Sequence, residues 1–418
     1  MKNFGFRKLM IFIILSATVA IAYQLPYLRY TFYDQMIDVL SLNNTQLAFI
    51  GTAVSIMSVI CYPIGGILAN RYSTRNLIII TLAAFVGLTV WFAFTTNYIM
   101  LVVIHFLYGF FGIATLWSAY LNGIRNLGTP ETQSTLFGSS EATRGIIQTI
   151  FGFVFLGIVG AIAAPAVGFK TMLLVGAAIT AVFLVLAIIF LPKEEKNDVE
   201  TVEAEEKFSL KDVLTNKGVW IVTLLLAGGY TTWSVGNGYL TTYTVQVLGI
   251  SDSLASALGI VRSYIIVFLA GFIGGWLLDK FSYKGKGLFI LFCIIIGCIL
   301  GVMFTSAVMP ICVAMTLVIA FFANVIKATY WSTMEQAGIP AKMTALATGI
   351  ISFIGFMPDL IITMLCGILL DNATAAGNVA AGFTQIFMIL IAFAVLGIVA
   401  SIMLMKRTKA LEKTGAAE

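Results

Sequence analysis

The sequence predicts an all-α membrane protein whose twelve transmembrane helices form two pseudo-symmetric six-helix bundles. Three observations lead to this prediction: the composition, the spacing of apolar segments, and an internal repeat. Of the 418 residues, 60% are hydrophobic and 10% are charged, whereas a soluble domain carries about 25% charged residues. A chain this apolar needs a lipid bilayer as the solvent for most of its side chains.

Apolar segments of about 20 residues, the length that crosses a bilayer, recur along the whole chain. They lie at 9–32, 46–70, 76–95, 98–124, 136–162, 168–191, 218–246, 253–279, 287–307, 310–335, 343–370 and 381–405. The chain therefore divides into an N-terminal bundle (1–191), a charged cytoplasmic linker (192–217), a C-terminal bundle (218–405) and a cytoplasmic tail (406–418). The linker is rich in charge and poor in apolar residues, so we expect it to be solvated.

The basic residues predict the orientation of the spans. Of the 24 lysine and arginine residues, 19 lie in the linker, the tail and the segments on one side of the membrane. Lys170 lies on the other side, and Arg29, Arg144, Arg262 and Lys327 fall within or at the edge of spans. By the positive-inside rule, both termini of this multi-pass protein are expected in the cytoplasm, with the chain in the inner (plasma) membrane.

The two halves of the chain echo each other. Residues 65–75 (GGILANRYSTR) match residues 274–284 (GGWLLDKFSYK) at an offset of 209, and both segments follow the second span of their half. A second echo links residues 114–118 (ATLWS) with residues 328–332 (ATYWS). Two echoes at the same relative places predict an internal duplication.

The paired segments at 65–75 and 274–284 resemble the loop signature of the major facilitator superfamily. The matching positions are Gly66, Asn70, Arg71 and Arg75 in the first copy, and Gly275, Asp279, Lys280 and Lys284 in the second. The resemblance covers the whole chain through span count, linker and topology. It implies a secondary carrier that works by alternating access, with these loops as a gate on the cytoplasmic side.

The physical chemistry of the gate is simple, because glycine permits close helix packing and a carboxylate favours a helix N-terminus. This sequence departs from the family pattern at Asn70, where an aspartate is usual. We therefore expect a weaker latch in the first half, with Asp279 carrying more of it. The alternative is that the basic residues of both copies only set the topology.

The first span resembles that of one branch of the family. Residues 23–32 (YQLPYLRYTF) are similar to the aromatic, arginine-bearing first helix of bacterial sugar-phosphate and organic-anion permeases. The fifth span lacks the Gly-Pro-x-x-Gly-Gly pattern of drug/proton antiporters. The resemblance implies a monomeric transporter of a small organic anion, a carboxylate or an organophosphate, that acts by proton symport or anion exchange.

Charged residues inside spans are candidate functional residues, because each costs about 2.5–3.5 kcal/mol at the bilayer centre on insertion scales. Arg262 and Lys327 are expected to bind an anionic substrate, and Arg29 is a further candidate, either as a cavity cation or as an outer-gate residue. Arg262 and Asp359 lie at similar depths, ~14 and ~18 Å from the outer ends of their helices. The alternative is therefore that each cation neutralises a carboxylate such as Asp359.

Four further ionisable residues are candidates for charge pairing or proton coupling. Glu141 and Arg144 are three residues apart, so we expect them to pair on one helix face; the alternative is a proton-coupling Glu141. Asp34 lies near Arg29 at the outer end of the first span. The unperturbed pKa of histidine suits proton coupling, so His105 is a candidate for that role, although a lone histidine in an apolar helix is more often a packing residue.

Aromatic and amide side chains complete the expected substrate site, since such mixtures suit a wet and selective cavity. They are Tyr23, Trp117, Tyr120, Asn237, Tyr330 and Trp331. Part of this set also fits an interfacial aromatic belt.

Two other classes of function remain as alternatives. One is a carrier of neutral or zwitterionic solutes, such as dipeptides, nucleosides or sugars, whose buried cations are all paired internally. The other is a membrane enzyme or receptor. The sequence carries no metal-ligand cluster, no nucleophile elbow and no phosphate-binding loop, so it predicts no enzymatic activity, cofactor, metal or nucleic-acid partner.

Overall fold

The structure is a computed structural model that describes residues 5–128, 133–193, 209–340 and 343–414. Within these ranges the secondary structure is helical, with turns between the helices and no strand. Eleven of the described helices are long and apolar enough to cross a membrane. The segments separate by their contacts into two units, residues 1–201 with 252–260 and residues 202–251 with 261–418.

The first predicted span, 9–32, is not one helix in the structure. It consists of α1 (Phe6–Ala22), the 3-10 helix η1 (Leu25–Tyr30) and then α2 (Tyr33–Leu40). Pro26 is the second residue of η1, and Tyr27 has non-helical backbone angles of φ −111° and ψ 21°. Because proline has no backbone N–H and clashes with the preceding turn, it breaks the α-helix at this point. This break is why the first span is absent from the eleven long helices.

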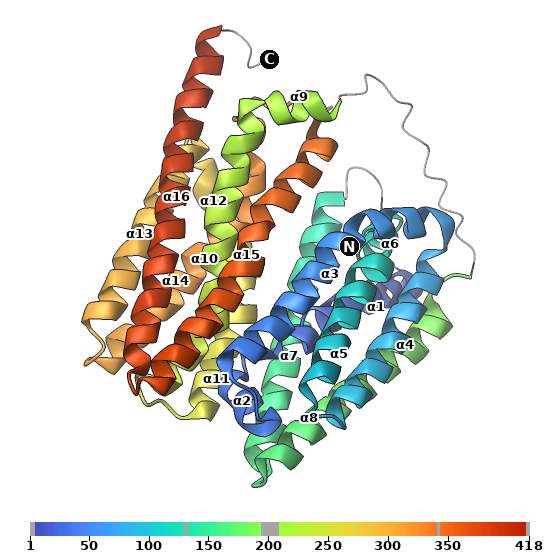
Figure 1. Ribbon diagram of the computed structural model, residues 1–418. Helices are drawn as coiled ribbons and strands as arrows, with labels where there is room; N and C mark the ends of the chain where they lie inside the picture. Colours follow the sequence, from blue (N-terminus) through green and yellow to red (C-terminus); the bar gives the residue numbers. More distant parts are fainter. Residues whose placement is uncertain (1–4, 129–132, 194–208, 341–342, 415–418) are drawn as a thin grey trace. The chain divides into compact units, whose positions relative to one another are not determined.

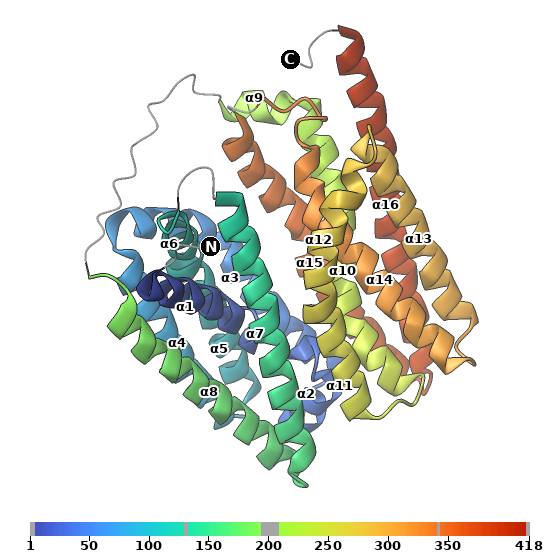
Figure 2. The same ribbon diagram turned by 180° about the vertical axis from the view of Figure 1, so that it is seen from behind.

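The other elements of unit 1 follow the predicted spans closely. They are α3 (Asn44–Arg71), α4 (Thr74–Ala93), α5 (Tyr98–Phe110), the π-helix η2 (Phe111–Trp117), α6 (Ser118–Arg125), α7 (Gln133–Ala161) and α8 (Pro165–Phe190). Helix α4 packs against α8, α3 against α5, and α1 against α7; Figure 2 shows α1 beside α7. The fourth span is therefore α5, η2 and α6 in one line, with a π-helical middle.

Polar caps fix where three of these helices begin. Asn43 accepts a hydrogen bond from the Gln46 backbone N–H (2.8 Å), while its own N–H donates to the Gln46 side chain (3.0 Å). Ser73 caps α4 and Asn97 caps α5 in the same manner, each accepting from a backbone N–H three residues on. Such caps satisfy N–H groups that the first turn leaves without a partner.

Unit 2 is built around one long, deeply buried helix, α10 (Lys217–Gln246). It packs against α14 (Met309–Thr329), α15 (Thr344–Ala375) and α16 (Val379–Thr414) (Figure 1). The remaining elements are α9 (Leu210–Thr215), the π-helix η4 (Val261–Ile265), α12 (Ile266–Asp279), α13 (Lys284–Phe304) and the 3-10 helix η5 (Tyr330–Thr333). The short helix α11 (Asp252–Ile260) precedes η4 in the eighth span and groups with unit 1.

The repeat at offset 209 is visible in the packing of two glycines. A Cβ added at Gly65 would lie 2.8 Å from the Ile113 carbonyl oxygen, where α3 meets η2 of the fourth span. A Cβ added at Gly274 would lie 3.2 Å from the Val325 side chain, where α12 meets α14 of the tenth span. The same residue thus permits the same close helix approach in both halves.

Candidate functional site

Three of the predicted aromatic residues meet in unit 1. The ring centroids of Tyr23, at the end of α1, and Trp117, in η2, are 6.2 Å apart in an edge-on arrangement. Trp117 lies 5.9 Å from Tyr120 on α6, and Tyr23 stacks with Tyr27 at 6.2 Å. Tyr23 and Trp117 are both partly exposed, so their ring surfaces remain available to a ligand.

A charge pair adjoins this aromatic cluster. Arg144 and Glu141 on α7 form an ion pair with an N–O distance of 2.5 Å, and their side chains are 20% and 47% exposed. The Arg144 guanidinium also lies 5.7 Å from the centroid of the Tyr23 ring. The structure therefore brings together five residues from three predicted spans, with the i, i+3 pairing that the sequence indicates.

Polar contacts between α1 and α7 hold this cluster in place, and sequence reasoning missed them. Gln24 donates its amide to the Gln148 carbonyl (3.2 Å), and Gln148 donates its amide to the Ala20 carbonyl (3.1 Å). About two helical turns earlier on each helix, the Ser16 and Ser140 hydroxyls are hydrogen bonded at 2.7 Å. Reciprocal amide bonds of this kind fix helix register in an apolar environment.

Arg29, in η1, is linked to the Tyr23 cluster through aromatic rings, because Tyr27 stacks with Tyr30 at 5.5 Å between centroids. It is buried, its guanidinium carbon lies 5.2 Å from the Tyr30 ring, and it packs on α3 at Gly51. A Cβ at Gly51 would stand 2.9 Å from the Arg29 Nε atom. Asp34 follows in the first turn of α2 and is half-buried.

In unit 2, Lys327 lies over an aromatic surface. Its Nζ atom is 3.2 Å from the centroid of the Trp233 ring, which comes from α10. Trp233 contacts Tyr230 (5.4 Å), and Tyr230 contacts Phe356 of α15 (4.4 Å between centroids). Lys327 and Trp233 are partly exposed, so unit 2, like unit 1, presents an accessible cation beside aromatic rings.

The other two predicted aromatic residues of the tenth span lie three and four residues after Lys327. Tyr330 and Trp331 occupy η5, with ring centroids 5.3 Å apart. Tyr330 is buried and Trp331 is partly exposed. Asn237 lies on α10 and is buried.

Arg262 is 1% exposed and lies in the π-helical segment η4. Its two terminal nitrogens donate hydrogen bonds to the hydroxyls of Thr316 on α14 (3.1 Å) and Thr241 on α10 (2.9 Å). Asp359 is buried on α15, where it accepts a hydrogen bond from Thr363 (3.1 Å). The structure thus gives Arg262 neutral hydroxyl partners, and Asp359 a hydroxyl of its own helix.

His105 packs within unit 1. Its Nδ1 atom lies 2.8 Å from the Leu101 carbonyl oxygen, and its ring contacts Phe92 (5.2 Å) and Tyr108 (5.7 Å) edge-on. The side chain is buried on all sides. This environment is that of a hydrogen-bonded packing residue.

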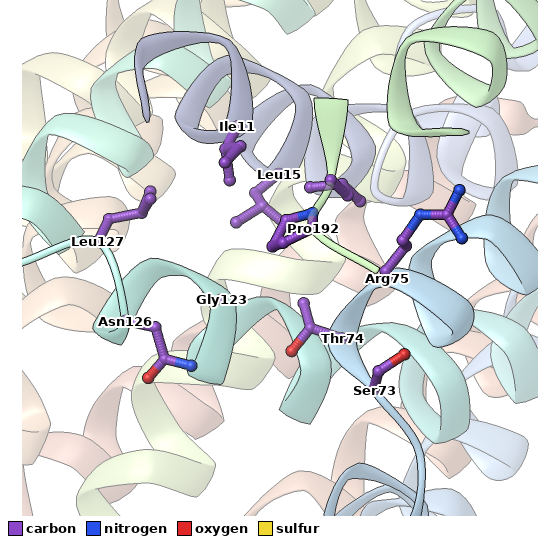
Figure 3. Close-up of a pocket in the computed structure, with 10 residues that line it drawn as sticks. Ile11, Leu15, Ser73, Thr74, Arg75, Gly123, Asn126, Leu127 and Pro192 are labelled. Carbon is purple, nitrogen blue, oxygen red and sulfur yellow. The ribbon is translucent and has the colours of Figure 1, made fainter. Parts of the chain in front are cut away.

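The first signature segment, residues 65–75, lies beside a small cavity lined by Ile11 and Leu15 of α1. Figure 3 shows Ile11 and Leu15 of α1 facing Thr74 and Pro192, with Arg75 at the edge. The volume of this cavity, about 30 Å³, is far below the ~300–1,000 Å³ of small-molecule sites. The Arg75 guanidinium donates to the Ile188 carbonyl of α8 (2.9 Å), so it ties α4 to the end of the sixth span.

The second signature segment, residues 274–284, is tied to the end of the tenth span. Lys284 donates its Nζ to the Ser332 carbonyl and its backbone N–H to the Gln336 side chain, both at 2.9 Å. Lys280 instead lies 3.3 Å from the Trp276 ring centroid. Arg75 and Lys284, the last basic residues of the two copies, therefore each donate a hydrogen bond to a backbone carbonyl of another helical element, α8 and η5 respectively.

The remaining signature residues make fewer contacts. Arg71 and Asp279 are exposed, and a Cβ added at Gly66 would meet nothing within 4 Å. The surroundings of Asn70 and Gly275 lie outside what the structure describes. The close helix approach is made instead by Gly65 and Gly274. The sequence repeat includes both glycines, but they were not among the residues predicted to form the gate.

Comparisons with known proteins agree with the fold. A family model described as Major Facilitator Superfamily matches residues 8–363. The chain is 26% identical over 410 residues to "Inner membrane protein YihN" of Escherichia coli (strain K12), covering 96% of each chain. It is 24% identical over 389 residues to "Inner membrane protein YqcE" of the same organism, covering 90% of each.

Solved structures share the architecture at low sequence identity. A D-xylose-proton symporter superposes with a TM-score of 0.75 at 15% identity, covering 95% of this chain and 96% of that chain. A bacterial homologue of the human lysosomal transporter Spinster, inward-facing and unoccupied, gives 0.72 at 13% identity and 98% coverage of each. The predicted fold of two helical bundles is confirmed by these likenesses.

The family model extends over most of the chain and includes both copies of the repeat at offset 209, residues 65–75 and 274–284. A multi-pass helical chain of this family carries out transport and not the chemistry of an enzyme. The protein therefore belongs to the Major Facilitator Superfamily and is a secondary transporter of a small solute.

Proposed function

We propose that the protein moves a small organic anion, a carboxylate or an organophosphate, across the inner membrane by alternating access. The observation that carries this proposal is the environment of Arg262. Its guanidinium is 1% exposed, and its hydrogen bonds among the described residues go to the hydroxyls of Thr241 and Thr316. Hydroxyls solvate a cation without cancelling its charge, so the guanidinium keeps a positive potential that favours an anion nearby.

Lys327 supports the same proposal. It lies on the face of Trp233, whereas Arg144, which lies near the face of Tyr23, is paired with Glu141. An aromatic face attracts a cation through its quadrupole but carries no net charge. Lys327 over Trp233 thus combines a positive head with an apolar wall, which suits the charged end and the carbon skeleton of an organic anion.

Coupling to protons or to a second anion is part of the proposal. Glu141, paired with Arg144, is 47% exposed, and Asp359 is buried beside Thr363. Protonation of Glu141 would release the positive charge of Arg144 for the substrate, and protonation of Asp359 would remove a buried negative charge; either is the kind of linkage that a symporter needs. Anion exchange needs no such step, because a second anion replaces the first.

One observation favours the alternative of a neutral or zwitterionic solute. The Glu141–Arg144 pair neutralises one of the four cations within or beside the spans. A site with balanced charge of this kind suits a dipeptide or another zwitterion. The proposal and this alternative therefore differ in whether Arg262 and Lys327 present net positive charge to the solute.

The proposed location follows from the relatives and from the basic residues. Both Escherichia coli relatives are named inner membrane proteins. The basic residues gather in the linker, the tail and the loops on the same side, which favours cytoplasmic termini. We propose a monomeric carrier of the inner membrane with this orientation.

Uptake into proteoliposomes tests the proposal. A panel of sugar phosphates, mono- and dicarboxylates, dipeptides and nucleosides would be offered with and without a proton gradient, and with an anion inside for exchange. Uptake of an anion is expected, and uptake of uncharged solutes alone would contradict the proposal. For proton symport, a protonophore is expected to abolish accumulation; for exchange, it has no effect while the internal anion is essential.

Charge variants connect uptake to the named residues. Arg262→Gln and Lys327→Gln are expected to lower anion uptake at least tenfold, and Arg262→Lys less. The matched control is Lys170→Gln, because Lys170 also lies over an aromatic ring, that of Phe94 at 3.9 Å, but at the start of α8. Normal uptake by both glutamine variants would refute the assignment.

A further inference from the structure

Three polar side chains on α10 stand out in unit 2. Thr231, Ser234 and Asn237 are 0%, 1% and 5% exposed. The Thr231 hydroxyl, the Ser234 hydroxyl and the Asn237 amide nitrogen have no hydrogen-bond partner among the described residues. Buried polar atoms are nearly always hydrogen bonded in folded proteins. Three such atoms within seven residues of one helix need an explanation.

Other hydroxyls on the same helix show the ordinary solution. Thr223 donates to the Val219 carbonyl (2.8 Å) and Thr232 to the Gly228 carbonyl (2.7 Å), each four residues back. This bond within one helix lets a hydroxyl lie in an apolar span at little cost. Thr231 and Ser234 make no such bond. Their hydroxyls therefore keep their full capacity for an external partner.

The three residues share a face of α10 with an anchor of Arg262. At 100° per residue, Ser234, Asn237 and Thr241 fall within ~60° of one another, and Thr231 lies ~60° beyond Ser234. The Thr241 hydroxyl accepts a hydrogen bond from Arg262. Seven residues separate Ser234 from Thr241, so these positions lie ~10 Å apart along the helix. The unsatisfied groups thus extend along the helix from the place where Arg262 is held.

We propose that Thr231, Ser234 and Asn237 form a subsite for hydroxyl groups, and that the transported anion is polyhydroxylated. The inference rests on the proposed function, because Arg262 then attracts the anionic group of the same molecule. A polyol chain offers both donors and acceptors. The Asn237 amide nitrogen donates to a substrate oxygen, and the Thr231 and Ser234 hydroxyls donate or accept. A sugar acid or a sugar phosphate has this chemistry, and a plain carboxylate does not.

Competition for uptake tests the inference with pairs of anions that differ in hydroxyl groups. Suitable pairs are tartrate with succinate, D-gluconate with hexanoate, and glycerol 3-phosphate with propyl phosphate. Each hydrogen bond to the substrate is expected to contribute about tenfold in affinity. The hydroxylated member of a pair is therefore expected to inhibit at a concentration at least tenfold lower. Equal inhibition by both members in the wild-type protein would overturn the inference.

Variants assign the preference to the three residues. Ser234→Ala, Thr231→Val and Asn237→Ala are each expected to weaken the hydroxylated competitor about tenfold and to leave its deoxy partner unchanged. Ser234→Ala removes one oxygen and no carbon, so it is the mildest variant. The matched control is Thr232→Val, since the Thr232 hydroxyl is satisfied within its own helix. Loss of both competitors alike in Ser234→Ala would show a structural role and overturn the inference.

The same assay separates this inference from the proposed function. If anions are transported without any preference for hydroxyl groups, the subsite is wrong and the anion proposal stands. If only uncharged solutes are transported, the anion proposal is wrong. The subsite is then tested with xylose against its deoxy analogues, and the same variants must remove the preference.

Discussion

Replacing Thr316 by valine tests how the buried guanidinium of Arg262 is held. Valine has nearly the same shape as threonine but no hydroxyl, so the Arg262 Nη1–H loses its acceptor at 3.1 Å. Thr316 is fully buried, so its hydroxyl is not exposed to solvent in this structure. A hydrogen bond to a charged group contributes about 1.5–3 kcal/mol. We expect Thr316→Val to lower the free energy of unfolding by about this amount.

Reversible unfolding in mixed micelles measures this change. Thr316→Ser keeps the hydroxyl and is the matched control, so it is expected to lose much less stability than the valine variant. Thr241→Val removes the second acceptor, at 2.9 Å, and is expected to cost a similar amount. If the valine and serine variants at 316 unfold alike, Arg262 does not depend on this hydroxyl, and the environment derived for it is wrong.

Two further predictions concern packing and pH. Gly65→Ala places a Cβ 2.8 Å from the Ile113 carbonyl oxygen, whereas Gly66→Ala meets open space. We expect Gly65→Ala alone to lower the free energy of unfolding, by about 1–3 kcal/mol, and therefore to melt at a lower temperature. Equal melting temperatures of the two variants would contradict this prediction. The Ser209 hydroxyl and backbone N–H hold the pKa of the Asp212 carboxyl below its usual value. The carboxylate therefore stabilises α9 above about pH 4, its unfolded value, and this contribution is lost as the pH falls through the lower folded pKa. Hydrogen-exchange protection of α9 is expected to fall at acid pH in the wild type but not in Asp212→Asn, and an identical pH profile in both would refute the assignment.

The spans were predictable from sequence because they depend on local chemistry. Long apolar segments need a bilayer whatever their partners are, and caps such as Ser73 lie beside the helix they begin. The Glu141–Arg144 pair was predictable for the same reason, since an i, i+3 spacing places both side chains on one face. The break in the first span also has a local signal, Pro26, but the prediction of a continuous first helix did not take this proline into account.

The partners of Arg262 were not predictable, because they depend on how separate helices pack. Depth along the helix suggested Asp359, but depth does not fix which way a side chain points around the helix axis. The π-helical segment η4 also shifts the register of the eighth span at Arg262, and a sequence gives no simple sign of a π-turn. Thr241 and Thr316 are common residues in apolar helices, so nothing marked them in advance.

The buried hydroxyls of α10 that lack a hydrogen-bond partner were missed for a related reason. Nothing in the sequence distinguishes Thr231 and Ser234 from Thr223 and Thr232, because all four are hydroxyl residues of the same span. Only the structure separates the hydroxyls that bond to their own helix from those that do not. Of this face, Asn237 alone was selected from the sequence, because a buried amide in a span is a conspicuous residue.

Anion uptake by Arg262 variants tests the central claim most directly. Proteoliposomes with the wild type, Arg262→Lys and Arg262→Gln would be compared at matched protein content, with folding checked by thermal denaturation. Anion uptake is expected to fall at least tenfold in Arg262→Gln and to be partly retained in Arg262→Lys, which keeps the positive charge. Undiminished anion uptake by a folded Arg262→Gln protein would contradict it.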